Sequence, residues 1–299
     1  MTVPDAKLDR PGALGEDMPQ SRSPSQSSSP EGSSLKGSSL KGSLPGDVSG
    51  VVMLLCQVAL GVAVLLVWQG ASGRLVDNFF ISNPIDVGRR LLGWTMDGSI
   101  FRHLWATVYA TTMGFFIGAV GGAVLGVWLG VSPLASRLLN PYLNALNALP
   151  KVALAPLFVL WFGLGLESKV ALAAVLVLFL VFLNTFAGVR EVDQDLIDGA
   201  RLMRATRAQV ITKVIIPSSM SWVFAGLKIS VPYALIGAVL GEMIAANRGL
   251  GYLVQFSGSQ FDSAGVFAVL FVIALLAVGL NFLVEVVQRR MERWRIVSR

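Results

Sequence analysis

Cysteine and histidine are almost missing from this 299-residue chain, which contains one of each, Cys56 and His103. A single cysteine excludes a disulfide framework within the chain and a metal site built from several cysteines. A phosphate-binding loop of the form Gly-x-x-x-x-Gly-Lys-Ser/Thr is also missing, so we expect no ATP hydrolysis by this polypeptide. These absences argue against an enzyme and against a bound cofactor.

Charged residues are scarce as well, at 14%, whereas hydrophobic residues make up 54% of the chain. Soluble domains contain about 25% charged residues, so this balance indicates that lipid surrounds most of the chain. The formal net charge is +6, but the basic residues lie between apolar runs and at the C-terminus. Membrane topology explains that distribution better than binding of nucleic acid does.

Six apolar segments are long enough to cross a bilayer, because about 20 apolar residues in a helix span roughly 30 Å of hydrocarbon. The segments are Val51–Trp68, Leu104–Leu129, Leu138–Phe162, Val170–Val189, Met220–Ala245 and Gly265–Val287. Prolines and charges interrupt the third and fifth segments: Pro150, Lys151, Pro156, Lys228, Pro232 and Glu242. Protein or a water-filled cavity must satisfy such groups within a membrane. The sequence therefore predicts an all-α, polytopic transmembrane helical bundle.

The chain divides into three parts by composition. Residues 1–49 are rich in Ser, Gly and Pro and lack apolar periodicity, which predicts a disordered N-terminal tail. The first apolar run begins only near Val51, so we interpret it as a retained membrane helix instead of a removed leader. The membrane domain is expected over 50–294, followed by a short basic end at 295–299.

Basic residues in the connections predict the orientation. With a cytoplasmic N-terminus, the cytoplasmic segments contain Arg137, Arg190, Arg201, Arg204, Arg207, Lys213, Arg289, Arg290, Arg293, Arg295 and Arg299. The external segments contain fewer: Arg74, Arg89, Arg90, Arg102, Lys169 and Arg248. The positive-inside bias therefore places both termini in the cytoplasm. The external stretch contains the helix-start signal Asn83-Pro84 before mixed apolar and charged residues, which predicts a short amphipathic helix at the outer interface.

Small residues recur every fourth position in the second membrane segment: Gly114, Gly118, Gly122, Gly126 and Gly130. On a helix this spacing makes one smooth ridge, which allows another helix to approach closely and gain van der Waals contact. The pattern predicts tight helix packing, and it says nothing by itself about transport.

The longest polar connection, 190–217, has the pattern of a helix. Acidic residues occupy its beginning and basic residues its later part, which matches the helix dipole. Arg201, Arg204 and Arg207 are spaced by three and are expected to share a face, whereas Leu196, Ala200 and Met203 supply an apolar stripe. Such a helix could rest on lipid head groups or dock on a soluble partner, and the residues alone leave both open.

The same connection resembles the cytoplasmic loop in the membrane subunits of bacterial binding-protein-dependent ABC importers, particularly the sulfonate, taurine and nitrate branch. That loop reads Glu-Ala-Ala, three residues, Gly, nine residues, Ile-x-Leu-Pro. Here Asp198-Gly199-Ala200, Arg204 and Val214-Ile215-Ile216-Pro217 stand at those positions with the spacing intact. Arginine replaces the glycine that supports the turn, and it adopts those backbone angles less readily.

Two further signatures of the branch occur in the expected order. One is Asn147 to Leu157 leading into Leu160 to Gly165, and the other is Gly241 to Leu253. The resemblance covers roughly Val51 to Trp294. It implies a permease of the type I importer fold that pairs with a second copy and docks its 198–207 segment on a cytoplasmic ATPase subunit. A periplasmic or lipid-anchored solute-binding protein would deliver the substrate at the bacterial plasma membrane.

Charged residues within the spans are the candidates for a gate or a substrate path. They are Lys151, Lys228 and Glu242, and Pro150 next to Lys151 is a candidate with them. Lysine also snorkels to the interface, so neither lysine is assigned to substrate by its position alone. An ion- or proton-coupled secondary transporter is the main alternative, but the repeated halves with matching broken helices that such proteins carry are not found here. A membrane scaffold would need an added soluble domain. The substrate stays open among sulfonates, taurine, nitrate and related small compounds.

Overall fold

The computed structural model describes residues 50–74, 77 and 79–292, and the architecture below is that of Leu54 onward. The predicted disordered tail and the basic end at 295–299 lie outside the described residues. The helices are α1 (Gly50–Ala71), α2 (Pro84–Met96), α3 (Ser99–Gly130), α4 (Pro133–Ala148), α5 (Ala155–Phe162), α6 (Leu166–Arg190), α7 (Gln194–Leu202), α8 (Arg207–Val210), α9 (Ile216–Ala245), α10 (Leu250–Ser259) and α11 (Ser263–Glu292). The prediction of an all-α fold is confirmed.

Five stretches of the described chain are long and apolar enough to cross a membrane: Val52–Ala71, Ser99–Gly130, Leu166–Arg190, Arg207–Ala245 and Ser263–Val286. The predicted third span is a bent pair, because α4 and the helices after it meet at an angle of 84°. Leu149, which precedes Pro150, has extended backbone angles (φ −66°, ψ 135°). A residue before proline avoids the helical region, so the helix ends there. Six spans result if the bent pair counts as one.

The predicted fifth span begins earlier than the sequence indicated. The helix runs for 39 residues from Arg207 to Ala245 and contains one π-helical turn at Ile211–Ile215. Pro217 follows that turn and cannot donate a backbone N–H to the preceding turn. The wider turn, in which the Ile216 N–H donates to the Ile211 carbonyl, accommodates the proline without ending the helix.

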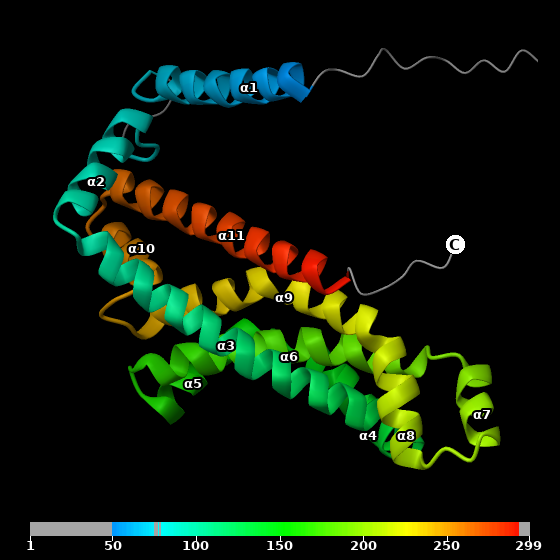
Figure 1. The fold of residues 1–299 in the computed structure, drawn as a ribbon. Helices are drawn as coiled ribbons and strands as arrows, with labels where there is room; N and C mark the ends of the chain where they lie inside the picture. The colour runs from blue at the N-terminus through cyan, green and yellow to red at the C-terminus, as the bar shows by residue number, and fades with distance from the viewer. Residues whose placement is uncertain (1–49, 75–76, 78, 293–299) are drawn as a thin grey trace, which may run out of the picture. The chain divides into compact units, whose positions relative to one another are not determined.

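The core is a layer of three long helices in which α6 lies between α3 and α9 (Figure 1). The glycine ridge of α3 lies directly against α6. A Cβ atom at Gly114 would lie 2.5 Å from the Ala173 Cβ, and one at Gly122 would lie 2.6 Å from the Leu178 carbonyl oxygen. Both distances are too short for real atoms, so only glycine permits this approach.

A second set of glycines brings α9 close to the other side of α6. A Cβ atom at Gly237 would lie 2.7 Å from the Ala173 Cα, and Gly226 and Gly241 approach α6 in the same way. Gly226 belongs to a ladder of small, buried residues at four-residue spacing in which serine and alanine stand beside glycine: Gly226, Ser230, Ala234 and Ala238. Ala173 is therefore held between a glycine of α3 and a glycine of α9.

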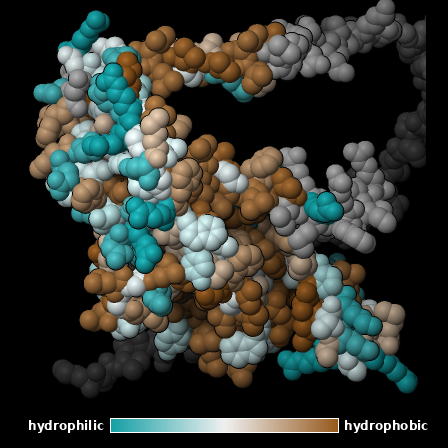
Figure 2. All heavy atoms as spheres, turned by 60° about the vertical axis from the view of Figure 1, so that its left-hand side comes forward, coloured by the Kyte–Doolittle hydropathy of each residue, from teal (hydrophilic) through white to brown (hydrophobic). Residues whose placement is uncertain are grey.

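Large hydrophobic side chains remain exposed along the outer faces of the spans, including Phe116 on α3 and Phe271 on α11. Figure 2 shows hydrophobic residues over much of the visible surface, with hydrophilic residues gathered toward its margins. A surface of this kind fits a lipid environment.

The predicted short helix after the first span is present as α2. The Asn83 side chain caps it by accepting a hydrogen bond from the Asp86 N–H at 2.8 Å, and Pro84 occupies the first turn. Its place at the outer interface stays a prediction.

Candidate functional site

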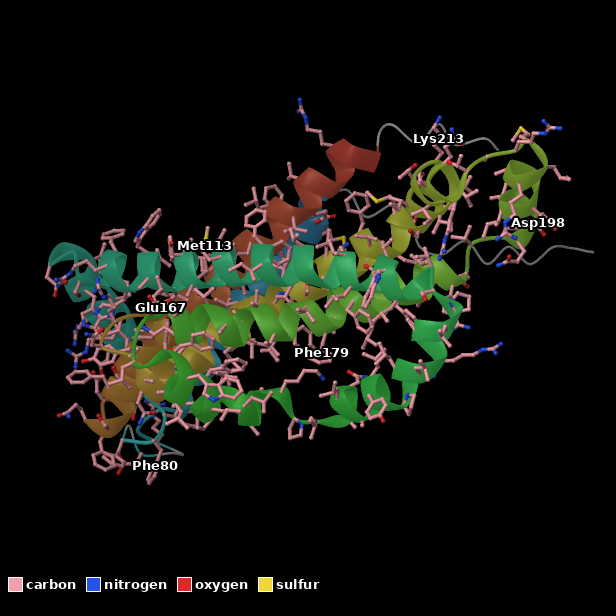
Figure 3. The ribbon with its side chains drawn as sticks, turned by 90° about the horizontal axis from the view of Figure 1, so that it is seen from below. Phe80, Met113, Glu167, Phe179, Asp198 and Lys213 are labelled. Atoms are coloured by element: carbon pink, nitrogen blue, oxygen red, sulfur yellow. The ribbon has the colours of Figure 1, made fainter. Side chains whose placement is uncertain are left out.

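The segment between α6 and α9 forms the candidate docking site, and it is anchored at both ends. At its start, the Arg190 guanidinium donates a hydrogen bond of 2.7 Å to the Ser136 hydroxyl, which ties the end of α6 to α4. At its end, α8 continues directly into the long helix through the π-helical turn. Figure 1 places α7 at one end of the bundle, and Figure 3 shows Asp198 at that end and Glu167 at the other.

The inner face of α7 packs on the membrane bundle through a small apolar cluster. Ile197 and Ala200 are buried there with Val189, Val192, Val210 and Ile215. Four different elements contribute to this cluster, so α7 is a fixed part of the fold and not a loose linker. The helix α7 is therefore in contact with the end of α6 and with the turn before α9.

The outer face of α7 carries apolar side chains that nothing in the described chain covers. Leu202 is 86% exposed, Met203 is 80% exposed and Leu196 is 55% exposed. The predicted single stripe of Leu196, Ala200 and Met203 is therefore wrong. Ala200 faces inward and is only 6% exposed, whereas Met203 lies beyond the last helical residue.

The three arginines do not share one helical face, because α7 ends at Leu202. Arg201 lies in α7 and pairs with Asp198 at 3.0 Å, Arg204 lies in the turn, and Arg207 begins α8. The Arg201–Asp198 pair is exposed on both sides and contributes little to stability. The prediction failed because regular spacing implies a shared face only while the helix continues.

Arg204 occupies the left-handed position that ends α7. Its φ is 59°, and it is one of two non-glycine residues with positive φ among the described residues. The Arg204 N–H donates to the Arg201 carbonyl at 2.8 Å, and the Ala205 N–H donates to the Ala200 carbonyl at 3.1 Å. These two bonds make a Schellman motif, in which glycine is the usual residue. This chain therefore keeps the turn with arginine at the position where glycine would be expected.

The next helix begins immediately after the turn. The Thr206 hydroxyl accepts from the Gln209 N–H at 3.3 Å, and the Gln209 side chain accepts from the Thr206 N–H at 2.8 Å. This reciprocal capping box fixes the start of α8. Together, the Schellman motif and the capping box fix the path of the chain between Gly199 and Arg207 through local hydrogen bonds.

Glu242, a candidate for a gate, is only 1% exposed. Its carboxylate accepts a hydrogen bond of 2.9 Å from the Thr107 hydroxyl and one of 2.8 Å from the Gly251 N–H. The structure therefore places it as a brace that joins α3, α9 and the start of α10. A carboxylate at a helix N-terminus also interacts favourably with the helix dipole.

The two candidate lysines lie on different elements. Lys151, next to Pro150 at the break in the bent pair, donates to the Asn147 carbonyl at 2.9 Å and lies 4.9 Å from the centre of the Phe179 ring. Lys228 is exposed on α9. The structure brings neither of them to Glu242 through a hydrogen bond or ion pair among the described residues.

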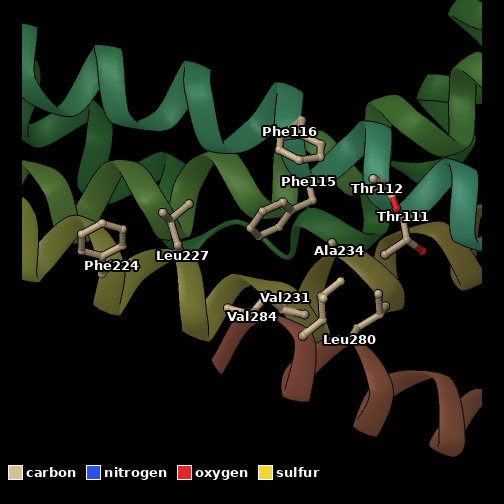
Figure 4. Close-up of a pocket in the computed structure, with 11 residues that line it drawn as sticks. Thr111, Thr112, Phe115, Phe116, Phe224, Leu227, Val231, Ala234, Leu280 and Val284 are labelled. Atoms are coloured by element: carbon tan, nitrogen blue, oxygen red, sulfur yellow. The ribbon is translucent and has the colours of Figure 1, made fainter. Parts of the chain in front are cut away.

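A large apolar pocket of about 390 Å³ lies between α3, α9 and α11 (Figure 4). Phe115, Phe224 and Leu280 are among its lining residues, and the described residues around it include no charged side chain. A charged solute would find no partner in this pocket, so we do not assign it to substrate.

Comparisons with known proteins agree with this architecture. Residues 118–295 match the family described as binding-protein-dependent transport system inner membrane component. The chain is 32% identical to the taurine transport system permease protein TauC of Escherichia coli over 80% of this chain and 90% of that protein. It is 35% identical to the riboflavin transport system permease protein RibX of Chloroflexus aurantiacus over 79% of this chain and 90% of that protein.

A third relative, the formylaminopyrimidine transport permease protein ThiX of Halalkalibacterium halodurans, is 32% identical over 72% of this chain and 86% of that protein. The fold is similar to that of a chain in the inward-facing MetNI methionine ABC transporter. That match has a TM-score of 0.57 and 22% identity, and covers 64% of this chain and 95% of that chain. The long apolar helices, the three-helix core and these matches have one explanation: the chain belongs to the binding-protein-dependent transport system inner membrane component family of ABC importer permeases.

Proposed function

We propose that α7 and the turn after it dock on a cytoplasmic ABC ATPase subunit and transmit its movements to the membrane helices. This proposal rests on the exposure of Leu202 at the end of α7 and of Met203 just after it, while Ile197 and Ala200 of the same helix are packed into the bundle. Apolar side chains that are exposed on a fixed element are typical of an interface. Arg201 and Arg207 on either side would add polar contacts at its rim.

The coupling follows a two-state logic. Nucleotide binding would change the separation of two ATPase subunits, and each would move one copy of α7. Because Ile197 and Ala200 are packed against the ends of α6 and α9, that movement would rock these helices between inward-open and outward-open states.

A second copy of this chain is the proposed partner within the membrane. Trp222, Ile229, Tyr233 and Ile236 recur on one face of α9 and are each at least 40% exposed, although α9 is otherwise a core helix. Such a face would be covered by a second copy, with the solute path near the shared axis. A solute-binding protein would deliver the solute at the side opposite α7.

The solute we propose is a sulfonate, taurine, nitrate or a related small organic compound. Family membership and two relatives of the sulfonate and taurine type support this range, but the relatives also include permeases named for riboflavin and formylaminopyrimidine. Uptake of labelled taurine and butanesulfonate by cells with and without the gene would test it. Uptake that survives ATP depletion and collapses with an ionophore would instead identify an ion- or proton-coupled secondary transporter.

The docking proposal is tested by Met203→Asp. A carboxylate at an apolar contact should expel the ATPase, while the exposed position leaves the fold intact. Tagged full-length chain would be purified from its own membranes, and co-purifying ATPase activity measured beside solute uptake. We expect both to fall at least tenfold.

Met96→Asp is the matched control, because Met96 is 87% exposed at the end of α2 and should tolerate the charge. Full ATPase recovery with Met203→Asp would refute docking through this face. Ala200→Asp would be a poorer test, because Ala200 is buried and an aspartate there would disturb the apolar cluster itself.

A further inference from the structure

A cavity of about 480 Å³ lies at the end of the bundle opposite α7 and is lined by three cationic side chains. Arg102 comes from the first turn of α3, Lys169 from the start of α6 and Arg248 from the link between α9 and α10. Glu167, two residues before Lys169, marks this end in Figure 3, far from Asp198. Helices that meet only in the tertiary fold therefore gather three positive charges around one space.

Lys169 is the unusual member of this group, because it is only 4% exposed. In the part of the chain that the structure describes, no hydrogen bond or ion pair joins its ammonium to another group. The residue nevertheless lines the cavity, and a lysine ammonium has three hydrogens to donate. An anion in the cavity would supply the missing acceptor.

The nearby carboxylates do not fill that role. Glu242 and Glu167 both act electrostatically on Lys169, but neither forms an ion pair with it. The Glu242 carboxylate is already engaged by Thr107 and the Gly251 N–H. Neither acid is among the residues that line the cavity, although the Glu167 carboxylate lies close to Gly165, which does line it.

Aromatic side chains complete the lining. Trp105 is 70% exposed and Tyr109 is 41% exposed, and both lie on α3 beside Arg102. They provide an apolar wall next to the charges. A ligand that suits this cavity has a compact oxyanion group for the lysine and arginines and a small organic body for the rings.

We propose that this cavity binds the oxyanion group of a sulfonate, phosphate or carboxylate, with Lys169 as its buried partner and Arg102 and Arg248 at the rim. Two sources could present that group: a solute entering from this side, or the headgroup of an anionic lipid. The first source rests on the proposed import function, and the second does not.

The test uses purified full-length chain in nanodiscs of phosphatidylcholine, with butanesulfonate as the probe and butanol as the uncharged control. Titration calorimetry should detect binding of butanesulfonate and not of butanol.

Lys169→Met should weaken the binding of butanesulfonate at least tenfold, because it removes a charge-assisted contact. Arg248→Gln should weaken it less, and because Arg248 is exposed, this variant tests the site even if Lys169→Met fails to fold. Arg89→Gln, whose side chain is 76% exposed, is the control and should bind normally.

Nanodiscs that contain phosphatidylglycerol separate the two sources. Binding of butanesulfonate without anionic lipid supports a solute site. Thermal stabilisation by phosphatidylglycerol that is lost in Lys169→Met, without butanesulfonate binding, supports a lipid headgroup site. If neither anion binds, or if Lys169→Met and Arg248→Gln bind both as well as the wild type, the inference is overturned. If the same wild-type chain still took up solute normally, the proposed import function would remain supported although the anion site would not.

Discussion

Replacing Arg204 by glycine should stabilise the end of α7. Arg204 has a φ of 59° in the Schellman motif, and an L-residue in that region costs about 1–2 kcal/mol relative to its usual conformation. Glycine removes this cost. It also has more conformational freedom in the unfolded chain, which lowers the stability of the folded state by about 0.4–1 kcal/mol. The net stabilisation expected is about 1 kcal/mol.

Local hydrogen exchange can measure a change of this size. The Ala205 N–H is bonded to the Ala200 carbonyl across the turn, so its exchange reports the opening of the motif. A stabilisation of about 1 kcal/mol should slow that exchange roughly fivefold in Arg204→Gly, after correction for the neighbouring residue. The long helices should exchange as in the wild type, because the change is confined to the turn.

Arg204→Ala is the matched control. It removes the guanidinium but keeps the side-chain β-carbon, so the left-handed strain remains and the exchange of Ala205 should not slow. If both variants slow the exchange equally, charge is responsible and the strain argument is wrong. If Arg204→Gly exchanges at the wild-type rate or faster, the left-handed turn does not limit the stability of α7.

Two further predictions concern packing and topology. Gly122→Ala should lower the stability of the bundle by about 1–3 kcal/mol, because its Cβ would lie 2.6 Å from a carbonyl oxygen of α6. The neighbouring Gly121→Ala, whose Cβ would lie 3.4 Å from a flexible side chain, should unfold near the wild-type temperature, and equal losses in both would contradict close packing by the ridge. In a Cys56→Ser background, Met96→Cys should react with an impermeant thiol reagent from outside the cell. Leu202→Cys, equally exposed, should react only after lysis, and labelling of it from outside would reverse the proposed orientation.

Local patterns were sufficient to locate the apolar membrane segments, although not the bend in the third or the early start of the fifth. Hydropathy depends on each segment's own residues, so the spans could be found without knowing their neighbours. Pro150 signalled an interruption of the third span for a similarly local reason, since proline restricts the residue before it. The angle of 84° at that break could not be predicted, because the restriction on the residue before proline fixes where the helix ends but not the direction of the next helix.

For the candidate docking segment, too, some features could be predicted from the sequence and others could not. Its position, its helical character and the unusual Arg204 could be recognised from residue types and spacing. Which apolar residues face inward could not, because α7 has apolar groups on more than one side. Contact with Val189, Val210 and Ile215 buries Ile197 and Ala200 and leaves Leu202 and Met203 outside.

Sequence alone determined the class of this protein: an all-α membrane permease with a helical polar segment between two spans and a glycine-lined helix. Only the tertiary structure decided the partners of its polar and small residues. Glu242 meets Thr107 across 135 positions of chain, and Lys169 meets Arg102 and Arg248 around one cavity. The physical reason is that hydropathy and helix propensity are properties of neighbouring residues, whereas burial, hydrogen bonding and charge clustering depend on helices that are distant in sequence packing side by side.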